Sequence, residues 1–396
     1  MEILKENTKS LCSSCYKEID AQVFAENNSV YLRKKCDEHG ESTSLAERDV
    51  DFYKRMMHKE PDPDPAYQIL VIPIEYRCNM RCKYCYLPYE GQKNISFEKV
   101  RKIVDNFKGH TIGLSGGEPT LREDLPQILE YIAGKGKQSA LVTNGLKLVD
   151  MDYLRALKRA GLGIIFFGFN GFTDKSDANI YNMPDSTKTK LKALENLQKE
   201  KIRTVISATI AMGTNDDQIL PLFEYSARNS DFVFQLRLRS VTNVGRHGDE
   251  QGLFISELLE MFCKKVGLNK NRVLDELNCG EYENTNYHFA VRVFFHNDGD
   301  SIKIVPSLSW KAYNGSSRFG RLIKVFGDLK AAETLKAVSK RIFKKQALLG
   351  SLSVRFISWP DVNNFDLYEA DRGTAHLYDQ SEIINFCHAI ILNDKL

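Results

Sequence analysis

Three cysteines in one short segment constrain this chain more than any other feature of its sequence. Cys78, Cys82 and Cys85 lie within Arg77–Tyr86, and one loop with this spacing can ligate three irons of a four-iron cluster. The fourth iron then has no protein ligand and is open to a small molecule. A cluster that only transfers electrons would need a fourth thiolate, so the spacing favours a catalytic site.

Composition narrows the class of protein. The 396 residues are enough for two or three domains. No apolar stretch approaches the roughly 20 residues of a membrane span, and the N-terminus has no secretory pattern, so we expect a cytoplasmic protein. The 55 basic and 52 acidic residues leave a net charge of +3, which gives no strong nucleic-acid signal.

A second group of metal ligands lies near the N-terminus. Cys12 and Cys15 form one short knuckle, and Cys36 and His39 form another about twenty residues later. Three sulfurs and one imidazole match a tetrahedral structural site, with zinc as the default metal and a rubredoxin-like iron as the alternative. The residues between the knuckles predict a small β-hairpin that turns at 26–28.

Prolines at 61, 63 and 65 prevent a helix and mark the first boundary. We predict a metal-binding module at 1–60, a core at 61–246 and a C-terminal substrate or cap domain at 247–396. In the core, short β-branched runs alternate with amphipathic segments, which is typical of βαβ units. The predicted strands are 69–74, 111–115, 139–143, 163–169, 204–211 and 232–239. The predicted helices are 97–107, 125–133, 153–160, 187–199 and 218–228, the first capped by Ser96.

These units predict an α/β fold, a partial (β/α)6 TIM-like barrel with functional residues at the carboxyl ends of its strands. The zinc-ribbon or rubredoxin-like module precedes this barrel. An α+β domain follows it, with helices, strands at 289–295, 302–306 and 352–358, and a basic helix around 336–345. Cys263, Cys279 and Cys387 are scattered there and are interpreted as buried free thiols, with one further site-open cluster as the alternative. Trp359, Asp361 and Asp366 belong either to a substrate pocket or to a surface turn.

The turn Leu114–Thr120 contains Gly116, Gly117 and Glu118 at the end of the second predicted strand. Glycines let the backbone approach a ligand closely, and a carboxylate can accept from an amine. A cysteine loop after the first strand and this turn after the second resemble the radical S-adenosylmethionine (radical SAM) superfamily over roughly 69–246. A structural zinc loop or an electron-carrier cluster is the alternative, but neither explains the glycines.

The resemblance implies that Cys78, Cys82 and Cys85 ligate a [4Fe-4S] cluster whose open iron is occupied by SAM. The cluster would cleave SAM reductively to a radical that abstracts a hydrogen atom. The other residues that it assigns to the cofactor are Tyr84 at the adenine, Gly116, Gly117 and Glu118 at the methionine end, Asn144, Asn170, Ser207 and Arg237.

Many relatives end the fourth strand with Ser-Leu-Asp-Gly, whereas this chain has Gly168-Phe169-Asn170-Gly171. A ribose contact at Gly168 is therefore lost. Arg237 and Arg239 alternate onto one face, where they suit a contact to the SAM carboxylate or an anionic substrate, and equally a structural ion pair.

The N-terminal knuckles narrow the resemblance to the tetraether lipid synthase and methylase-like group. We expect an enzyme that activates a C–H bond of a small-molecule, lipid or natural-product substrate, with flavodoxin or ferredoxin as reductant. A peptide-modifying maturase is the alternative within the superfamily. From other classes, a zinc-ribbon nucleic-acid modification factor predicts a basic face, and an iron-sulfur redox carrier predicts no SAM cleavage.

Overall fold

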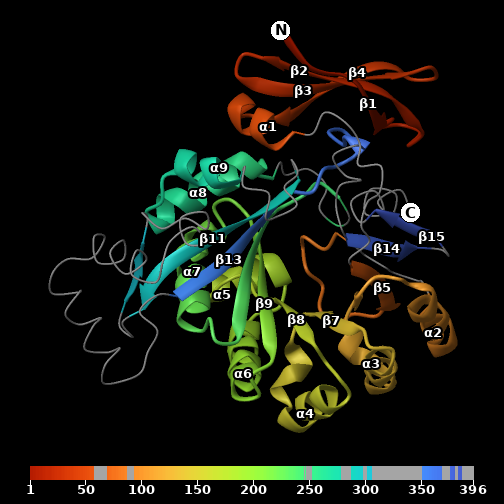
Figure 1. Cartoon of the computed structure of the whole chain (residues 1–396), viewed down its shortest axis with the longest axis vertical. Helices are drawn as coiled ribbons and strands as arrows, with labels where there is room; N and C mark the ends of the chain where they lie inside the picture. Colours follow the sequence, from red (N-terminus) through yellow and green to blue (C-terminus); the bar gives the residue numbers. More distant parts are fainter. Residues whose placement is uncertain are drawn as a thin grey trace.

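The computed structural model describes residues 1–57, 69–86, 93–244, 246, 252–277, 287–297, 301–305, 350–367, 375–379 and 382–385. The predicted spacer at 61–65, the basic helix around 336–345, Cys279 and Cys387 lie outside these ranges. The described strands form two sheets, one of four strands and one of eleven. Figure 1 shows the four-stranded sheet at one end of the long axis of the molecule.

The N-terminal sheet is an antiparallel meander followed by one short helix. Its elements are β1 (Glu2–Leu11), β2 (Glu18–Glu26), β3 (Ser29–Cys36), β4 (Gly40–Glu47) and α1 (Val50–Met56). The predicted hairpin is confirmed, since β2 and β3 meet at Asn27 and Asn28 with φ angles of 49° and 61°. Two positive φ angles are typical of a type I′ turn, which asparagine tolerates. This turn fixes the register that brings the two cysteine knuckles to one end of the sheet.

The larger sheet contains the six predicted parallel strands, side by side in chain order. They are β5 (Ile69–Glu75), β6 (Thr111–Gly116), β7 (Gln138–Thr143), β8 (Ile164–Gly168), β9 (Arg203–Ile210) and β10 (Val233–Ser240). The helices between them are α2 (Phe97–Asn106), α3 (Leu125–Gly134), α4 (Met151–Arg159), α5 (Asp174–Ser176), α6 (Ser186–Lys199) and α7 (Ile219–Arg228), with short turns η1 (Pro119–Leu121), η2 (Leu146–Val149), η3 (Asp177–Tyr181) and η4 (Asp216–Gln218). The predicted α/β partial barrel is confirmed, and its predicted strand and helix bounds lie within two residues of those observed.

The two faces of these strands differ in character. Outward-facing side chains such as Ile72 on β5, Ile206 on β9 and Leu236 on β10 are fully buried against the helices. Inward-facing side chains such as Ser207 and Arg237 are only partly buried. This alternation is that of a strand with one face on a packed core and the other toward a polar interior. The polar interior of the barrel is where a ligand can reach the strands.

Strands from the predicted C-terminal region extend the barrel sheet at both edges. The C-terminal elements are α8 (Ile255–Val266), α9 (Lys270–Leu277), β11 (His288–Asn297), β12 (Ile302–Ile304), β13 (Gly350–Ile357), β14 (Ala375–Asp379) and β15 (Glu382–Asn385). β13 pairs parallel with β10, and β14 pairs parallel with β5. The sheet order is therefore β12-β11-β13-β10-β9-β8-β7-β6-β5-β14-β15. None of the helices in the described ranges is long and apolar enough to cross a membrane.

Buried polar contacts join the N-terminal sheet to the C-terminal segment 358–366. Lys5 on β1 donates to Asp366 at 2.8 Å, and both side chains are almost fully buried. Thr8 donates to the other oxygen of the same carboxylate at 2.6 Å. Lys34 on β3 donates to the carbonyl oxygen of Val362 at 2.8 Å. Because a buried charge is costly without a partner, these contacts fix how the sheet sits on the rest of the molecule.

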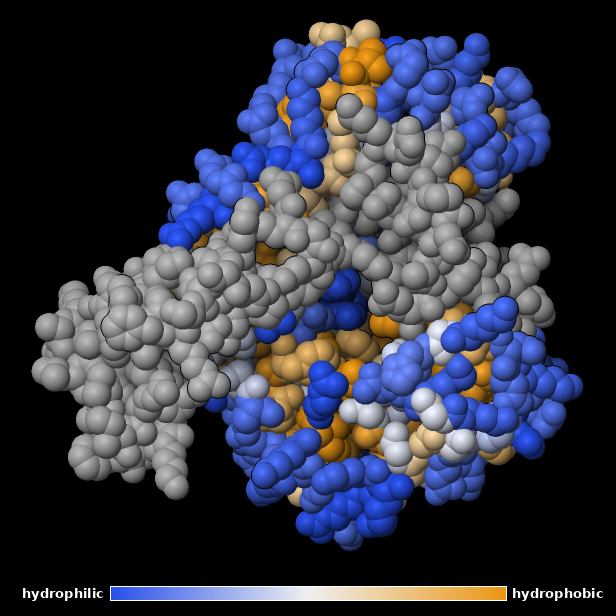
Figure 2. Space-filling view, viewed as in Figure 1, coloured by the Kyte–Doolittle hydropathy of each residue, from blue (hydrophilic) through white to orange (hydrophobic). Residues whose placement is uncertain are grey.

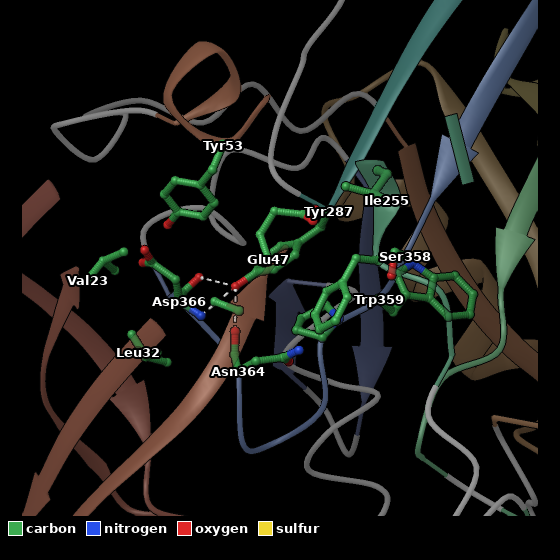
Figure 3. Close-up of a pocket in the computed structure, with 13 residues that line it drawn as sticks. Val23, Leu32, Glu47, Tyr53, Ile255, Tyr287, Ser358, Trp359, Asn364 and Asp366 are labelled. Atoms are coloured by element: carbon green, nitrogen blue, oxygen red, sulfur yellow. Dashed lines mark hydrogen bonds between the residues drawn. The ribbon is translucent and has the colours of Figure 1, made fainter. Parts of the chain in front are cut away.

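A small cavity lies at this junction (Figure 3), between β4, α1, the start of α8 and the 358–366 segment. Tyr287 points into it and bonds Asp366 and Asn364 through its hydroxyl. Asp366 and Trp359 both line the cavity. The polar segment that the sequence assigned to a substrate pocket or a surface turn thus contributes a structural junction.

Glu47 in this cavity makes the stability of the protein depend on pH. Its carboxylate is 3% exposed and accepts from the hydroxyl of Ser256 at 2.6 Å. Burial raises the pKa of Glu47 to about 7, although the donors from Ser256 and the Arg48 N–H oppose the shift. The folded protein therefore keeps this proton up to about pH 7, whereas an unfolded chain loses it near pH 4.3. The contribution of Glu47 to stability falls as pH rises between these two values.

We expect Glu47→Gln to remove this dependence. Relative to wild type, the variant should gain up to about 3 kcal/mol of stability between pH 5 and pH 8. Thermal unfolding midpoints of both proteins across this pH range measure the difference. A difference that stays constant with pH contradicts the interpretation.

Candidate active site and metal centre

The cysteine loop follows β5 at the carboxyl end of the barrel strands. The N–H of Lys83 donates to the carbonyl oxygen of Ile180 at 2.8 Å, and the N–H of Arg246 donates to that of Cys85 at 3.1 Å. Met80 and Tyr84 pack with Ile180 and its neighbours in a small apolar cluster. The C-terminal half of the loop is therefore held by two other parts of the barrel rim.

The loop cysteines suit a group larger than one metal ion. Burial, and then the neighbouring thiol of Cys85, raise the pKa of Cys82 to about 11, so the thiols are close enough to influence one another. Among the described residues, however, only the N-terminal ligands bring three or more metal-binding atoms within 4.8 Å. A four-iron cluster binds each thiolate to a different iron, so it does not need three sulfurs as close together as a single metal ion does.

Gly116 and Gly117 bring the second strand end against the root of the cysteine loop. The N–H of Gly117 donates to Glu75 at 2.7 Å, and the N–H of Glu118 donates to Arg77 at 2.9 Å. A Cβ at Gly117 would lie 2.4 Å from the Arg77 oxygen, and one at Gly116, where φ is +127°, would lie 2.1 Å from the Glu75 oxygen. The two glycines are needed for this backbone contact, independently of any contact with a ligand.

Gly117→Ala should therefore displace the cysteine loop. A shift of about 1 Å at reacting groups can cost on the order of a hundredfold in rate, and we expect a loss of this size in any reaction that depends on the loop cysteines. Gly134→Ala is the matched control, because a Cβ there meets nothing within 4 Å. Equal activities of the two variants would show that the contact is unimportant.

Glu118 is buried and held at the centre of the rim. One carboxylate oxygen accepts from the Thr120 N–H and hydroxyl and from the Thr143 hydroxyl, at 3.1, 2.6 and 2.7 Å. The other oxygen accepts only the N–H of Asn144 at 2.7 Å among the described contacts. A carboxylate can accept about four hydrogen bonds, so the second oxygen retains capacity for a ligand amine.

The asparagines predicted to contact the cofactor also hold the protein together. Asn144 donates from its amide to Asn79 in the cysteine loop at 2.7 Å. Asn170 is 3% exposed and its Oδ1 accepts the N–H of Thr209 at 2.7 Å. Its amide nitrogen is the group that could serve a ribose hydroxyl. Ser207 faces the barrel interior opposite Gly168 on β8.

Arg237 lies deeper in the barrel, with its guanidinium 4.3 Å from the ring centroid of Phe166. Its Nε donates to Gln235 at 2.8 Å. The structure thus brings the loop cysteines, Glu118 and both asparagines together at the rim and places Arg237 beneath them.

Sequence reasoning missed Lys190 on α6. This side chain is fully buried, and its ammonium donates to the carbonyl oxygens of Asn144 and Gly168 at 2.6 and 2.8 Å. Its charge also lowers the pKa of Cys82, against the larger effect of burial. A lysine in an amphipathic helix normally indicates a solvated face, so only the fold reveals this position.

The N-terminal knuckles form a preorganised tetrahedral site. The sulfurs of Cys15 and Cys36 are 3.9 Å apart, and Nδ1 of His39 lies 3.7 Å from Cys12 and 3.5 Å from Cys36. Zinc bonds of about 2.3 Å to sulfur and about 2.0 Å to nitrogen predict ligand separations of about 3.8 and 3.6 Å. The donor set fits a zinc ion, and rubredoxin-like iron has similar geometry. Cys263, by contrast, is a buried thiol in the apolar packing of α8.

Comparisons with known proteins match the two regions of the chain that contain these residues. Residues 72–225 match the radical SAM superfamily, whose members use a [4Fe-4S] cluster and SAM. Residues 4–48 match the HMPTM N-terminal zinc ribbon domain.

Curated relatives are enzymes. The chain is 28% identical over 276 residues to 7,8-dihydro-6-hydroxymethylpterin dimethyltransferase of Methanocaldococcus jannaschii, covering 61% of the chain and 54% of the relative. It is 31% identical over 148 residues to Fe-coproporphyrin III synthase of Methanosarcina barkeri, covering 36% of the chain and 37% of the relative. It is 26% identical over 301 residues to GTP 3',8-cyclase of Aquifex aeolicus, covering 70% and 88%. The chain thus spans about half the length of the first relative and less of the second.

Residues 72–225 belong to the radical SAM superfamily, and the chain joins this domain to an N-terminal zinc ribbon.

Proposed function

We propose that this protein is an enzyme that cleaves SAM reductively and activates a C–H bond of a small-molecule, lipid or natural-product substrate. The observation that carries the proposal is the contact of Gly117 and Glu118 with residues 75 and 77. It supports a role for the Glu118 carboxylate as the acceptor of an amine, beside a loop with three cysteines. That arrangement suits a cluster with one iron open to SAM.

The residues of the chain have distinct parts in this proposal. Cys78, Cys82 and Cys85 hold the [4Fe-4S] cluster, which supplies the electron that breaks a carbon–sulfur bond of SAM. Glu118 accepts from the SAM amine through its less occupied oxygen. Asn170 donates to a ribose hydroxyl, and Tyr84 lies against the adenine. The partly buried barrel interior holds the substrate away from bulk water.

The cluster needs an external one-electron donor, and a flavodoxin or ferredoxin would meet this need in a cell. Anaerobic reconstitution with iron and sulfide, followed by dithionite and SAM, tests the proposal. We expect 5′-deoxyadenosine to form. A protein that binds the cluster fully yet forms none of it, with or without candidate substrates, is not a radical SAM enzyme of this kind.

Methyl transfer to a small heteroaromatic molecule is a second candidate. It is favoured by the matched zinc ribbon and by the 276-residue similarity to a pterin dimethyltransferase. Incubation with 7,8-dihydro-6-hydroxymethylpterin and mass spectrometry of the product tests it. A mass gain of whole CH2 groups supports methylation, and an unmethylated oxidised or rearranged product supports the first candidate.

A further inference from the structure

Four residues at paired positions on neighbouring strands form one row across the barrel interior. The strand register pairs Gly168 on β8 with Ser207 on β9, Ser207 with Arg237 on β10, and Arg237 with Arg355 on β13. Arg239 lies two residues nearer the carboxyl end of β10 and faces the same way. Three arginines therefore share one wall of the barrel.

Placing arginines opposite each other on neighbouring strands is unfavourable, because like charges at paired positions repel. Among the described residues, no carboxylate forms an ion pair with Arg237 or Arg239. Arg239 instead donates to the Thr209 hydroxyl at 3.2 Å, and its buried Nε has no hydrogen-bond acceptor among the residues that the structure describes. In the described part of the chain, the contacts of Arg237 and Arg239 thus leave the positive charges of these two side chains without a carboxylate partner.

Burial and the positive charges of neighbouring arginines both contribute to the lowered pKa values of Arg237 and His288. Desolvation, followed by the charges of Arg355 and Arg239, lowers the pKa of Arg237. Burial, followed by Arg355 and Arg237, lowers the pKa of His288 to about 3, so this imidazole is neutral. An anion bound at the wall would relieve the repulsion among the arginines.

Aromatic rings hold the guanidinium groups in place. Arg237 lies over Phe166, and Arg239 lies 5.5 and 5.4 Å from the ring centroids of Tyr86 and Trp359. Stacked guanidinium groups lose little entropy when they bind an anion.

The strand beside Ser207 carries no side chain at the paired position, Gly168. A Cβ there would meet no atom closer than 3.6 Å, so packing does not require the glycine. In Figure 2 the middle of the visible face is hollowed, and strongly hydrophilic side chains lie within the hollow.

We propose that Arg237, Arg239 and Arg355 bind a phosphate group of the substrate inside the barrel, an inference that rests on the function proposed above. A phosphate dianion offers three oxygens to guanidinium forks and balances more charge than one carboxylate. Since Arg239 contacts Tyr86, the residue after Cys85, the remainder of the substrate would extend from the phosphate toward the cluster. The anion would thus set which C–H bond lies near SAM.

Calorimetric titration of the anaerobically reconstituted full chain with inorganic phosphate tests this site. We expect binding to wild type, and binding about tenfold weaker or worse in Arg237→Gln and in Arg355→Gln. Arg159→Gln, at an exposed position on α4, removes the same charge and should bind like wild type. The visible absorbance of the cluster checks that each variant is loaded and folded.

The inference is overturned by no binding to wild type, by wild-type affinity in both barrel variants, or by equal affinity for acetate, which indicates a carboxylate substrate. Abolition of phosphate binding by saturating SAM would also overturn it, because the arginines would then serve the SAM carboxylate. These last measurements use wild type and do not depend on the variants. Formation of 5′-deoxyadenosine without phosphate binding rejects only this inference, whereas phosphate binding without SAM cleavage rejects the proposed function.

Discussion

Cys82→Ala is expected to abolish 5′-deoxyadenosine formation by the reconstituted protein. Two thiolates from the loop remain, but a four-iron cluster with one open iron needs three. Iron bound per chain should fall sharply, and the visible absorbance of the cluster should disappear. Because the loop is held by the Ile180 contact and by the glycine turn, the rest of the fold should persist.

Cys263→Ala is the matched control, since it makes the same substitution at a buried cysteine packed in α8. Cluster content and SAM cleavage should stay at wild-type values in this variant. Equal product from Cys82→Ala and wild type would mean that the cysteine loop does not hold the catalytic cluster.

His39→Ala is expected to empty the N-terminal metal site. Structural zinc sites contribute about 10 to 16 kcal/mol of apparent binding free energy, and three remaining ligands cannot close the tetrahedron. After dialysis against a chelator, zinc should fall from about one ion per chain toward none. The unfolding midpoint should fall by about 10 °C or more. Cluster iron should be unchanged, because the two sites use different residues.

His110→Ala replaces another exposed histidine, in the turn before β6, and should retain its metal. Metal analysis and thermal unfolding of the two variants, side by side, give the comparison. Unchanged zinc and iron in His39→Ala would show that the knuckles are not a metal site.

The strands and helices of the barrel were predictable from the sequence because residues close together in the chain specify each of them. Ser96 illustrates this: its hydroxyl accepts the N–H of Lys99 at 3.2 Å and caps α2, as expected from the residue type and its position. The N-terminal site was predictable for the same reason, since its four ligands come from two short knuckles joined by one hairpin.

Contacts between distant segments could not be predicted in this way. Nothing local to β13 indicates that it lies beside β10, so the pairing of Arg355 with Arg237 is visible only in the fold. The same holds for Lys190, whose two carbonyl partners come from the ends of β7 and β8. Apolar patterns specify which face of a strand is buried but not which strand lies next to it.

The pairing of β14 with β5 has a consequence for biosynthesis. β5 leads directly into the cysteine loop, yet its outer neighbour, through the pair Ile69 and Ala375, is translated about three hundred residues later. Such distant pairing forms slowly and late. On the ribosome, the edge of β5 stays open until residues 375–379 have emerged. Iron delivered before that point would meet an unfinished sheet, so cluster insertion is expected to follow the emergence of residues 375–379.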